Sequence, residues 1–156
     1  MDTSPICVGW REWVAFPEWG VAAMKAKIDT GARTSAIHAF DVEMFERDDG
    51  EWVRFGIHPW QRSDDDAVVV EAERLDERTV TSSSGTRSDR LVVRADLHLG
   101  RRTVPIELTL TRRDEMGFRM LVGREALAQG YVVDPAASYL GGRPDKQTRR
   151  RNRGRT

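Results

Sequence analysis

Two neighbouring segments of period-two alternation constrain this chain more than any other feature. Every second residue is apolar in residues 91–99 and again in residues 104–110, at Leu91, Val93, Ala95, Leu97 and Leu99 and then at Val104, Ile106, Leu108 and Leu110. A period of two places successive side chains on opposite faces, which is typical of half-buried β-strands. Because residues 100–102 (GRR) favour a turn, the sequence predicts a long β-hairpin here.

Shorter segments elsewhere show the same pattern. Residues 53–57 alternate after the turn signal at residues 48–50 (DDG), and short strands are predicted around residues 67–72 and 75–80. Residues 21–28 (VAAMKAKI) have the composition of a helix, but Met24, Ala26 and Ile28 alternate with lysines. We predict a strand for this segment because the alternation is regular up to its last residue.

One helix has a clear signature. Residues 124–129 (REALAQ) follow Gly123 and are closed by Gly130, a residue that commonly ends helices. The sequence thus predicts many strands and a single short helix, which indicates an all-β fold. The expected form is a closed or partly closed β-barrel with one short C-terminal helix.

The charge distribution divides the chain into a body and a tail. The 156 residues contain 25 basic and 25 acidic side chains, but residues 143–156 hold seven Lys or Arg against one Asp. The tail therefore carries +6 and residues 1–142 carry −6. We expect one folded domain over residues 1–142 and a disordered basic tail over residues 143–156.

Composition also limits the setting in which the protein works. The sequence has no apolar run of the length that spans a membrane, and residues 1–5 (MDTSP) lack the features of a secretory signal. We therefore expect a cytoplasmic protein. Cys7 is the only cysteine, which excludes an intrachain disulfide and a cysteine-based zinc cluster.

The sequence Asp29-Thr30-Gly31-Ala32 directly follows the predicted strand 21–28 and fits the chemistry of an aspartic peptidase. Such enzymes hold two carboxylates close enough to share one proton, so that the pair activates a water against the scissile carbonyl. Gly31 permits a tight turn, and the Thr30 hydroxyl can hydrogen-bond to a facing loop. Asp29 is the candidate catalytic residue, and Thr30, Gly31 and Ala32 support its loop.

A second element strengthens this interpretation. Residues 120–127 (MLVGREAL) form an apolar strand that ends in Gly123-Arg124 and continues into the predicted helix. This pattern resembles the strand and helix that lie behind the active-site loop of retroviral proteases. We therefore expect Gly123 and Arg124 to support the Asp29 loop.

The resemblance extends to a bacterial family. It rests on residues 8–14 (VGWREWV), 25–39 (KAKIDTGARTSAIHA), 108–110 (LTL) and 116–124 (MGFRMLVGR), and covers about residues 6–143. These segments resemble the RimK-associated, RimB-like, retropepsin-like family that is also labelled "ATP-dependent zinc protease". The resemblance implies a retropepsin-type barrel and a functional link to ATP-grasp ligases that add glutamate residues to proteins. It makes this chain a candidate for trimming such glutamate tails.

The residues themselves give no support to the ATP and zinc in that label. The sequence has neither a phosphate-binding Gly-x-x-x-x-Gly-Lys-Ser/Thr loop nor a His-Glu-x-x-His motif. Its histidines, His38, His58 and His98, are too widely spaced to indicate a zinc site. We therefore predict no metal ligand and no cofactor.

Several polar residues near the motif have two interpretations. Arg33 and His38 are candidates for substrate binding, and the arginine could pair with an acidic substrate side chain or with Asp29 itself. The other interpretation is an ordinary salt bridge at the rim of the barrel. Residues 81–86 could be a flap over a bound peptide or a plain hairpin loop. The basic tail could contact RNA or a ribosomal surface, but a solubilising role is the simpler one.

The number of motifs predicts a homodimer. A dyad needs two carboxylates on facing loops, and the chain contains a single Asp-Thr-Gly. The simplest solution is a symmetric dimer that pairs Asp29 with its copy, using the Asp29 loop and a terminal strand near residues 131–134 or 138–140. The alternative is a non-catalytic binding module that recognises an acidic protein tail or a partner ATP-grasp ligase.

Overall fold

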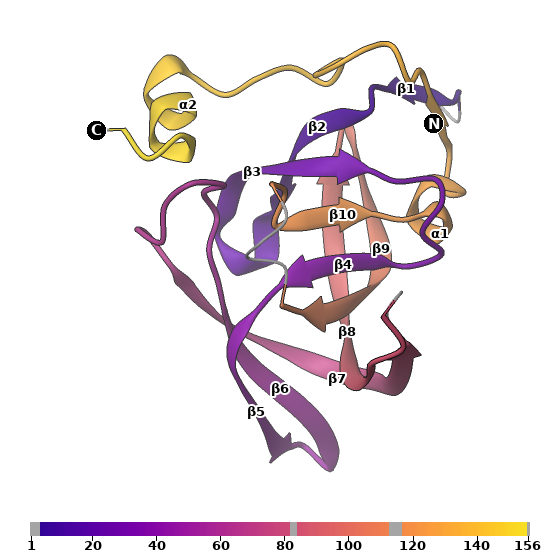
Figure 1. Cartoon of the computed structure of the whole chain (residues 1–156), viewed down its shortest axis with the longest axis vertical. Coiled ribbons are helices and arrows are strands. Elements are labelled where there is room, and N and C mark those ends of the chain that lie inside the picture. The colour runs from indigo at the N-terminus through magenta and orange to yellow at the C-terminus, as the bar shows by residue number, and fades with distance from the viewer. Residues whose placement is uncertain (1–3, 82–83, 113–116, 156) are drawn as a thin grey trace.

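A computed structural model of the chain describes residues 4–81, 84–112 and 117–155 and shows a fold built mostly of β-strands (Figure 1). In these residues the strands are β1 (Ile6–Val8), β2 (Arg11–Phe16), β3 (Val21–Ile28), β4 (Ser35–His38), β5 (Phe40–Arg47), β6 (Gly50–Ile57), β7 (Val68–Thr81), β8 (Arg87–Leu99), β9 (Arg102–Thr111), β10 (Met120–Val122) and β11 (Tyr131–Val133). A short 3-10 helix, η1 (Pro17–Trp19), joins β2 to β3.

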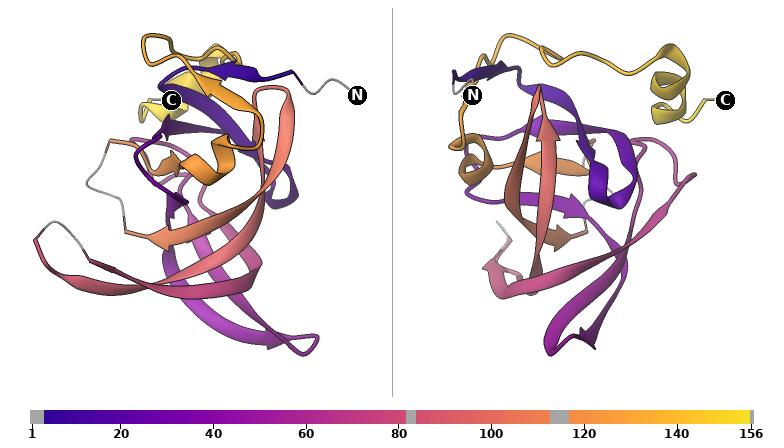
Figure 2. Two further views of the ribbon diagram at one scale, coloured as in Figure 1. Left: turned by 90° about the vertical axis from the view of Figure 1, so that its right-hand side faces the viewer. Right: turned by 180° about the vertical axis from the view of Figure 1, so that it is seen from behind.

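The strand pairings close into a ring. Within the described residues the large sheet has the order β2-β3-β10-β4-β9-β8-β7-β6-β5, and β2 also pairs with β8. The ring therefore contains β2, β3, β10, β4, β9 and β8, while β7, β6 and β5 extend beyond it as an arm (Figures 1 and 2). A separate parallel pair, β1 with β11, joins two segments from opposite ends of the chain.

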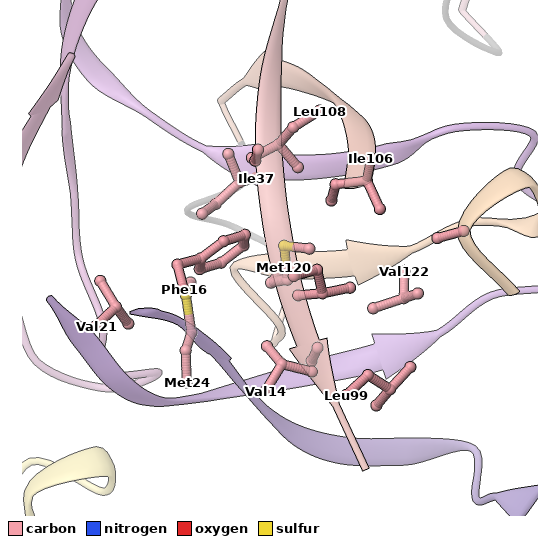
Figure 3. Packing of buried hydrophobic residues seen from close by; sticks show 14 of the residues in the cluster. Val14, Phe16, Val21, Met24, Ile37, Leu99, Ile106, Leu108, Met120 and Val122 are labelled. Carbon is pink, nitrogen blue, oxygen red and sulfur yellow. The ribbon is translucent and has the colours of Figure 1, made fainter. Parts of the chain in front are cut away.

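The core fills the inside of this ring. Figure 3 shows buried side chains from every strand of the ring, among them Phe16, Met24 and Met120. Leu99 and Leu108 are fully buried on β8 and β9, as their alternation predicts. Burying such side chains is the main force that holds the ring together, at about 1.5–3 kcal/mol for each fully buried aliphatic or aromatic residue.

The predicted hairpin and the predicted strand at residues 21–28 are confirmed as β8–β9 and β3. The two strands predicted at residues 67–72 and 75–80 are in fact one strand, β7. The pairing of β7 with β8 shifts register between Arg74 and Asp76, so Leu75 is an extra residue in the ladder. A β-bulge of this kind inverts the alternation without ending the strand, which explains why the pattern looked interrupted.

The basic C-terminal segment differs from the disordered tail that its composition predicts. Residues 146–152 form helix α2 (Lys146–Asn152), in addition to the expected helix, α1 (Arg124–Leu127). The Asp145 side chain caps α2 by accepting the Thr148 amide at 2.8 Å, as Asp commonly does at helix starts. At the other end Asn152 is almost fully buried: its Oδ1 accepts the Gln61 amide at 2.8 Å and its carbonyl accepts the Arg62 amide at 3.0 Å.

This correction has a simple physical reason. Composition measures how much apolar surface a segment can bury, and this one has almost none. The segment is instead held by a capped helix and by hydrogen bonds to a loop more than eighty residues earlier, which composition does not register. No helix in the described parts of the chain combines the length and apolar character needed to cross a membrane.

A buried carboxylate fastens the C-terminal segment to the ring. Glu12 on β2 has no exposed surface, and its Oε2 accepts the amides of Gly9 at 2.7 Å and Leu140 at 2.9 Å. Its Oε1 accepts the amide of Gly141 at 3.0 Å. Three backbone donors thus surround one charge, which offsets the cost of removing that charge from water.

We predict that Glu12→Ala destabilises the protein by about 2–4 kcal/mol, because three backbone amides lose a charged acceptor. Thermal unfolding followed by circular dichroism should show a melting temperature several degrees lower. Glu46→Ala, on the exposed face of β5, is the control and should leave the melting temperature nearly unchanged. Equal melting temperatures for the two variants would show that Glu12 does not hold the C-terminal segment.

Candidate functional site

Asp29 lies at the point where β3 leaves the sheet. Its amide donates to the Val122 carbonyl at 2.9 Å, which continues the parallel pairing of β3 with β10 by one residue. Its Oδ1 accepts the Gly31 amide at 3.0 Å, and its side chain is half-buried. The hydrogen bond fixes the direction of a carboxylate that solvent can still reach.

The order of strands explains why this loop is well defined. β10 lies between β3, to which it is parallel, and β4, to which it is antiparallel. The chain must therefore cross the C-terminal end of β10 as it passes from β3 to β4. Residues 29–34 make this crossing and lie directly against Gly123, the residue that follows β10 (Figure 1).

Backbone hydrogen bonds join the two segments. The Arg124 amide donates to the Ala32 carbonyl at 2.7 Å, and the Glu125 amide donates to the Arg33 carbonyl at 3.0 Å. The Gly123 amide donates to Oγ of Ser35 at 3.0 Å. The Arg124 side chain adds a bond from Nη1 to the Thr30 carbonyl at 3.0 Å. Thr30, Gly31, Ala32, Gly123 and Arg124 are thus brought together with Asp29.

Gly123 is required here for space. A Cβ at this position would lie 2.4 Å from the Thr34 carbonyl carbon and 2.5 Å from its oxygen. Both are backbone atoms, which cannot rotate away, so a larger residue must push the loop off β10. The absence of a side chain at Gly123 therefore sets how closely the Asp29 loop can lie to the end of β10.

The two candidate substrate-binding residues lie in different surroundings. Arg33 is on the loop, with a largely exposed side chain whose Nε lies 2.8 Å from Oε1 of Glu125. His38 lies at the far end of β4 from the loop and is buried. Its ring stacks on that of His58 at 5.7 Å between centroids, and His58 stacks in turn on Phe40. Only Arg33 is on the surface next to Asp29.

The histidine stack does not fit a zinc ion. The His38 and His58 rings are inclined by only 18° and lie one above the other. Imidazole binds a metal through a lone pair in the plane of its ring, and lone pairs in stacked, near-parallel planes do not converge on one ion. Across the described ranges, no three His, Cys, Asp or Glu side chains are grouped to hold a metal.

Asp64 and Arg119 adjoin this stack. A hydrogen bond from the Arg119 side chain, together with the nearby His58, holds the pKa of Asp64 below its usual value. Arg119 also donates to the carbonyls of Trp60 and Ser63 at 2.9 Å each. These contacts join the 58–67 loop to the residue that precedes β10, so the stack lies where two parts of the fold are held together.

The β7–β8 hairpin projects on the same side of the molecule as α1 and the Asp29 loop (Figures 1 and 2). Its tip contains residues 81–86, the segment with a flap and a plain loop as its two interpretations. Residues 82–83 lie outside the described residues, so neither interpretation is tested.

Comparison with known proteins assigns the family. Residues 7–144 match the RimB-like family, described as "Retropepsin-like aspartic endopeptidase RimB". The chain belongs to the RimB-like family. This confirms the resemblance read from the residues around Asp29 and Gly123.

The RimB-like chain also matches part of several longer proteins. It is 43% identical over 149 residues to a "Probable alpha-L-glutamate ligase" of Desulfotalea psychrophila, covering 94% of this chain and 32% of that protein. It is 46% identical over 139 residues to a protein of the same name from Parasynechococcus marenigrum, covering 88% of this chain and 29% of that protein. The chain therefore spans about a third of the length of these curated relatives.

A solved structure has the same fold. The crystal structure of a Legionella pneumophila protein of unknown function matches with a TM-score of 0.75 and 24% sequence identity. The match covers 88% of this chain and 99% of the other. The strand arrangement thus occurs in an independently determined structure.

Two residues of the site were not predicted. Ser35 is buried and accepts the Gly123 amide, and Glu125 pairs with Arg33. Both lie within the two motifs that the sequence singled out. The partners of their side chains could not be read from the motifs, because each partner lies on the other motif, about ninety residues away.

We predict that Gly123→Ala lowers the stability of the protein by about 1–3 kcal/mol, because the new Cβ overlaps the Thr34 backbone. Urea unfolding followed by tryptophan fluorescence measures this loss. The control is Gly50→Ala, where a Cβ would meet its nearest atom at an ordinary 3.5 Å. If Gly123→Ala were no less stable than Gly50→Ala, the close contact between the loop and β10 would be refuted.

Proposed function

We propose that this chain is an aspartic endopeptidase, active as a homodimer, in which Asp29 and its copy share one proton. The orientation of Asp29 carries this proposal: the Gly31 amide directs a half-buried carboxylate on a loop that β10 and α1 hold in place. A residue with only a structural role in a turn would not need its carboxylate accessible.

The chemistry follows from pairing two such carboxylates. Two acids held together cannot both be ionised, so one stays protonated and polarises the scissile carbonyl, while the other removes a proton from the attacking water. The two titrations belong to the pair and not to either residue. Because Thr30 is exposed beside Asp29, its hydroxyl is free to bond to the facing loop of the partner subunit.

The proposed interface uses the Asp29 loop and the β1–β11 pair. In that pair Ile6 and Val8 are buried, while Cys7 and its register partner Val132 are exposed, with Val132 51% exposed. An exposed apolar face on a two-stranded sheet suits the packing of a symmetric copy. We further propose that the strand ring is a retropepsin-type barrel.

The proposed substrate is a protein that carries a glutamate tail, acted on in the cytoplasm. The names of the relatives support this, since an alpha-L-glutamate ligase makes glutamyl bonds and the longer relatives combine that name with a segment similar to this chain. Arg33, whose side chain is 78% exposed, is the proposed contact for a substrate carboxylate. An ATP-grasp ligase is the proposed partner protein.

The same names favour a second function. A domain found within proteins named as ligases could recognise the glutamate tail, or the ligase itself, without cutting a bond. Asp29 would then serve only to shape its loop. Removing the charge of Asp29 while keeping its shape separates the two functions.

We predict that Asp29→Asn folds normally and loses peptidase activity on an oligoglutamate-tailed peptide by about 10³-fold, because Asn cannot take part in proton transfer. Mass spectrometry of the products measures cleavage. Asp49→Asn, at an exposed turn where Asn also tolerates the positive φ, is the control and should cut normally. Equal cleavage by the Asp29→Asn protein would exclude the aspartic mechanism.

We predict also that specific activity falls on dilution, because the dyad is lost when the dimer dissociates. Sedimentation velocity across a concentration series should show dimers at the concentrations where activity is full. A monomer with full specific activity would require a second catalytic group within one chain and would contradict the homodimer.

A further inference from the structure

Helix α2 places basic side chains against the outer side of the ring. The segment that follows β11 runs back across β2, and α2 then lies near β3 (Figure 1). Two neighbouring pockets, of about 340 and 200 Å³, lie where this segment meets the ring. Lys25 of β3 and Arg153 after α2 line both of them. The pockets therefore form one continuous surface.

This surface is strongly cationic. Besides Lys25 and Arg153, its basic side chains include Arg11, Arg62, Arg143 and Arg149. They come from β2, the 58–67 loop and the C-terminal segment, so only the docking of α2 brings them together. We call this set the cationic surface.

Carboxylates neutralise little of the cationic surface: in the described residues the charge of Asp145 interacts with that of Arg149, but Asp145 does not line either pocket. No acidic side chain lines either pocket, and none of these cations forms an ion pair. The arm formed by β5, β6 and β7 is different: Arg47 and Arg54 both pair with Glu71, and Arg74 pairs with Glu51. In a chain with equal numbers of acids and bases, an unpaired cluster of this kind is a place for an external anion.

Aromatic rings hold two of the cations in position. The Arg11 guanidinium lies 4.6 Å from the centroid of Trp10 and 4.9 Å from that of Tyr139. The Lys25 ammonium lies 5.4 Å from the centroid of Tyr139 and 5.8 Å from that of Trp13. Cation–π contacts limit the motion of these side chains, so less entropy is lost when an anion binds.

The same contacts identify the kind of anion. Single-stranded nucleic acids bind by stacking bases on free aromatic faces, but here cations already lie over the rings of Trp10, Trp13 and Tyr139. A flexible peptide that carries several carboxylates binds through salt bridges to the cations and does not require a free aromatic face. We infer that the cationic surface binds an acidic peptide segment, such as a run of glutamates, through salt bridges to Lys25, Arg153 and their neighbours.

The position of this surface relates it to the candidate active site. Trp10 accepts the Ile28 amide through its carbonyl at 2.8 Å, one residue before Asp29. The cationic surface thus begins beside β3, the strand that leads into Asp29, and extends away towards α2. A glutamate segment bound there would hold its own protein close to the Asp29 loop. This inference rests on the proposed function only for the source of the acidic segment.

The test measures binding separately from cleavage. Fluorescence anisotropy of a fluorescein-labelled oligoglutamate peptide is titrated with Asp29→Asn protein, which retains the cationic surface and is not expected to cut. Adding Arg153→Glu should weaken binding by about tenfold, the effect of one charge-assisted hydrogen bond. Lys25→Gln, which keeps a polar side chain on β3, should weaken binding in the same direction and guards against misfolding of the first variant.

The matched control is Arg94→Glu, which changes the charge equally at an exposed position on β8. It should leave the affinity for oligoglutamate nearly unchanged. The inference is overturned if wild-type surface does not bind the peptide, if Arg94→Glu and Arg153→Glu weaken binding equally, or if an oligothymidylate of equal charge binds more tightly. The last result would assign the surface to nucleic acid.

The outcome is distinct from that of the peptidase assay. Binding that depends on Arg153, without cleavage by the wild-type protein, would support the cationic surface and refute the peptidase. Cleavage by the wild-type protein without binding that depends on Arg153 would support the peptidase and refute the surface.

Discussion

The position of β10 between β3 and β4 is the constraint on which the candidate site depends. Two strands that are close in sequence are kept apart in space by a strand from near the end of the chain. The link between them must therefore cross the end of that strand, and Gly123 allows it to cross in direct contact. Everything specific to Asp29 follows from this crossing: the amide bond to Val122, the loop carbonyls bound by the start of α1, and the directed carboxylate.

A second constraint acts at the chain ends. β1 pairs with β11, and Glu12 gathers three amides from residues at both ends of the chain. The buried charge is tolerated because each oxygen is hydrogen-bonded, and it holds the segment that leads towards α2. The basic residues beyond position 142 are thus part of the folded body. The cationic surface exists only because this segment is fixed against β2 and β3.

These features suit one another if the substrate is acidic. Asp29 lies on the loop that follows β3, Arg33 lies on the same loop, and the cationic surface starts beside β3. Arginines on the arm form ion pairs with neighbouring glutamates, whereas in the described residues no acidic side chain lines the two pockets beside α2. The chain has no net charge, so this separation of paired from unpaired cations, and not an overall excess, is what would attract a glutamate tail.

The sequence by itself determined β3, β8 and β9 of the ring, because alternation is a local property that reports which face of a strand is buried, whereas β2 and β4 were not predicted. It also identified both halves of the loop support, Asp29-Thr30-Gly31 and Gly123-Arg124, because each has a distinctive composition. It did not determine that Ser35 and Glu12 are buried acceptors, that a bulge at Leu75 joins two strands into one, or that residues 146–152 form a docked helix. Only the tertiary structure decided these, because they depend on contacts between residues that are far apart in the sequence. Such contacts do not change the local pattern of apolar and polar residues. The charge of the tail was visible in the sequence. Whether the tail stays in solvent or docks on the folded domain depends on the hydrogen bonds of Asn152 to the 58–67 loop, which only the tertiary structure shows.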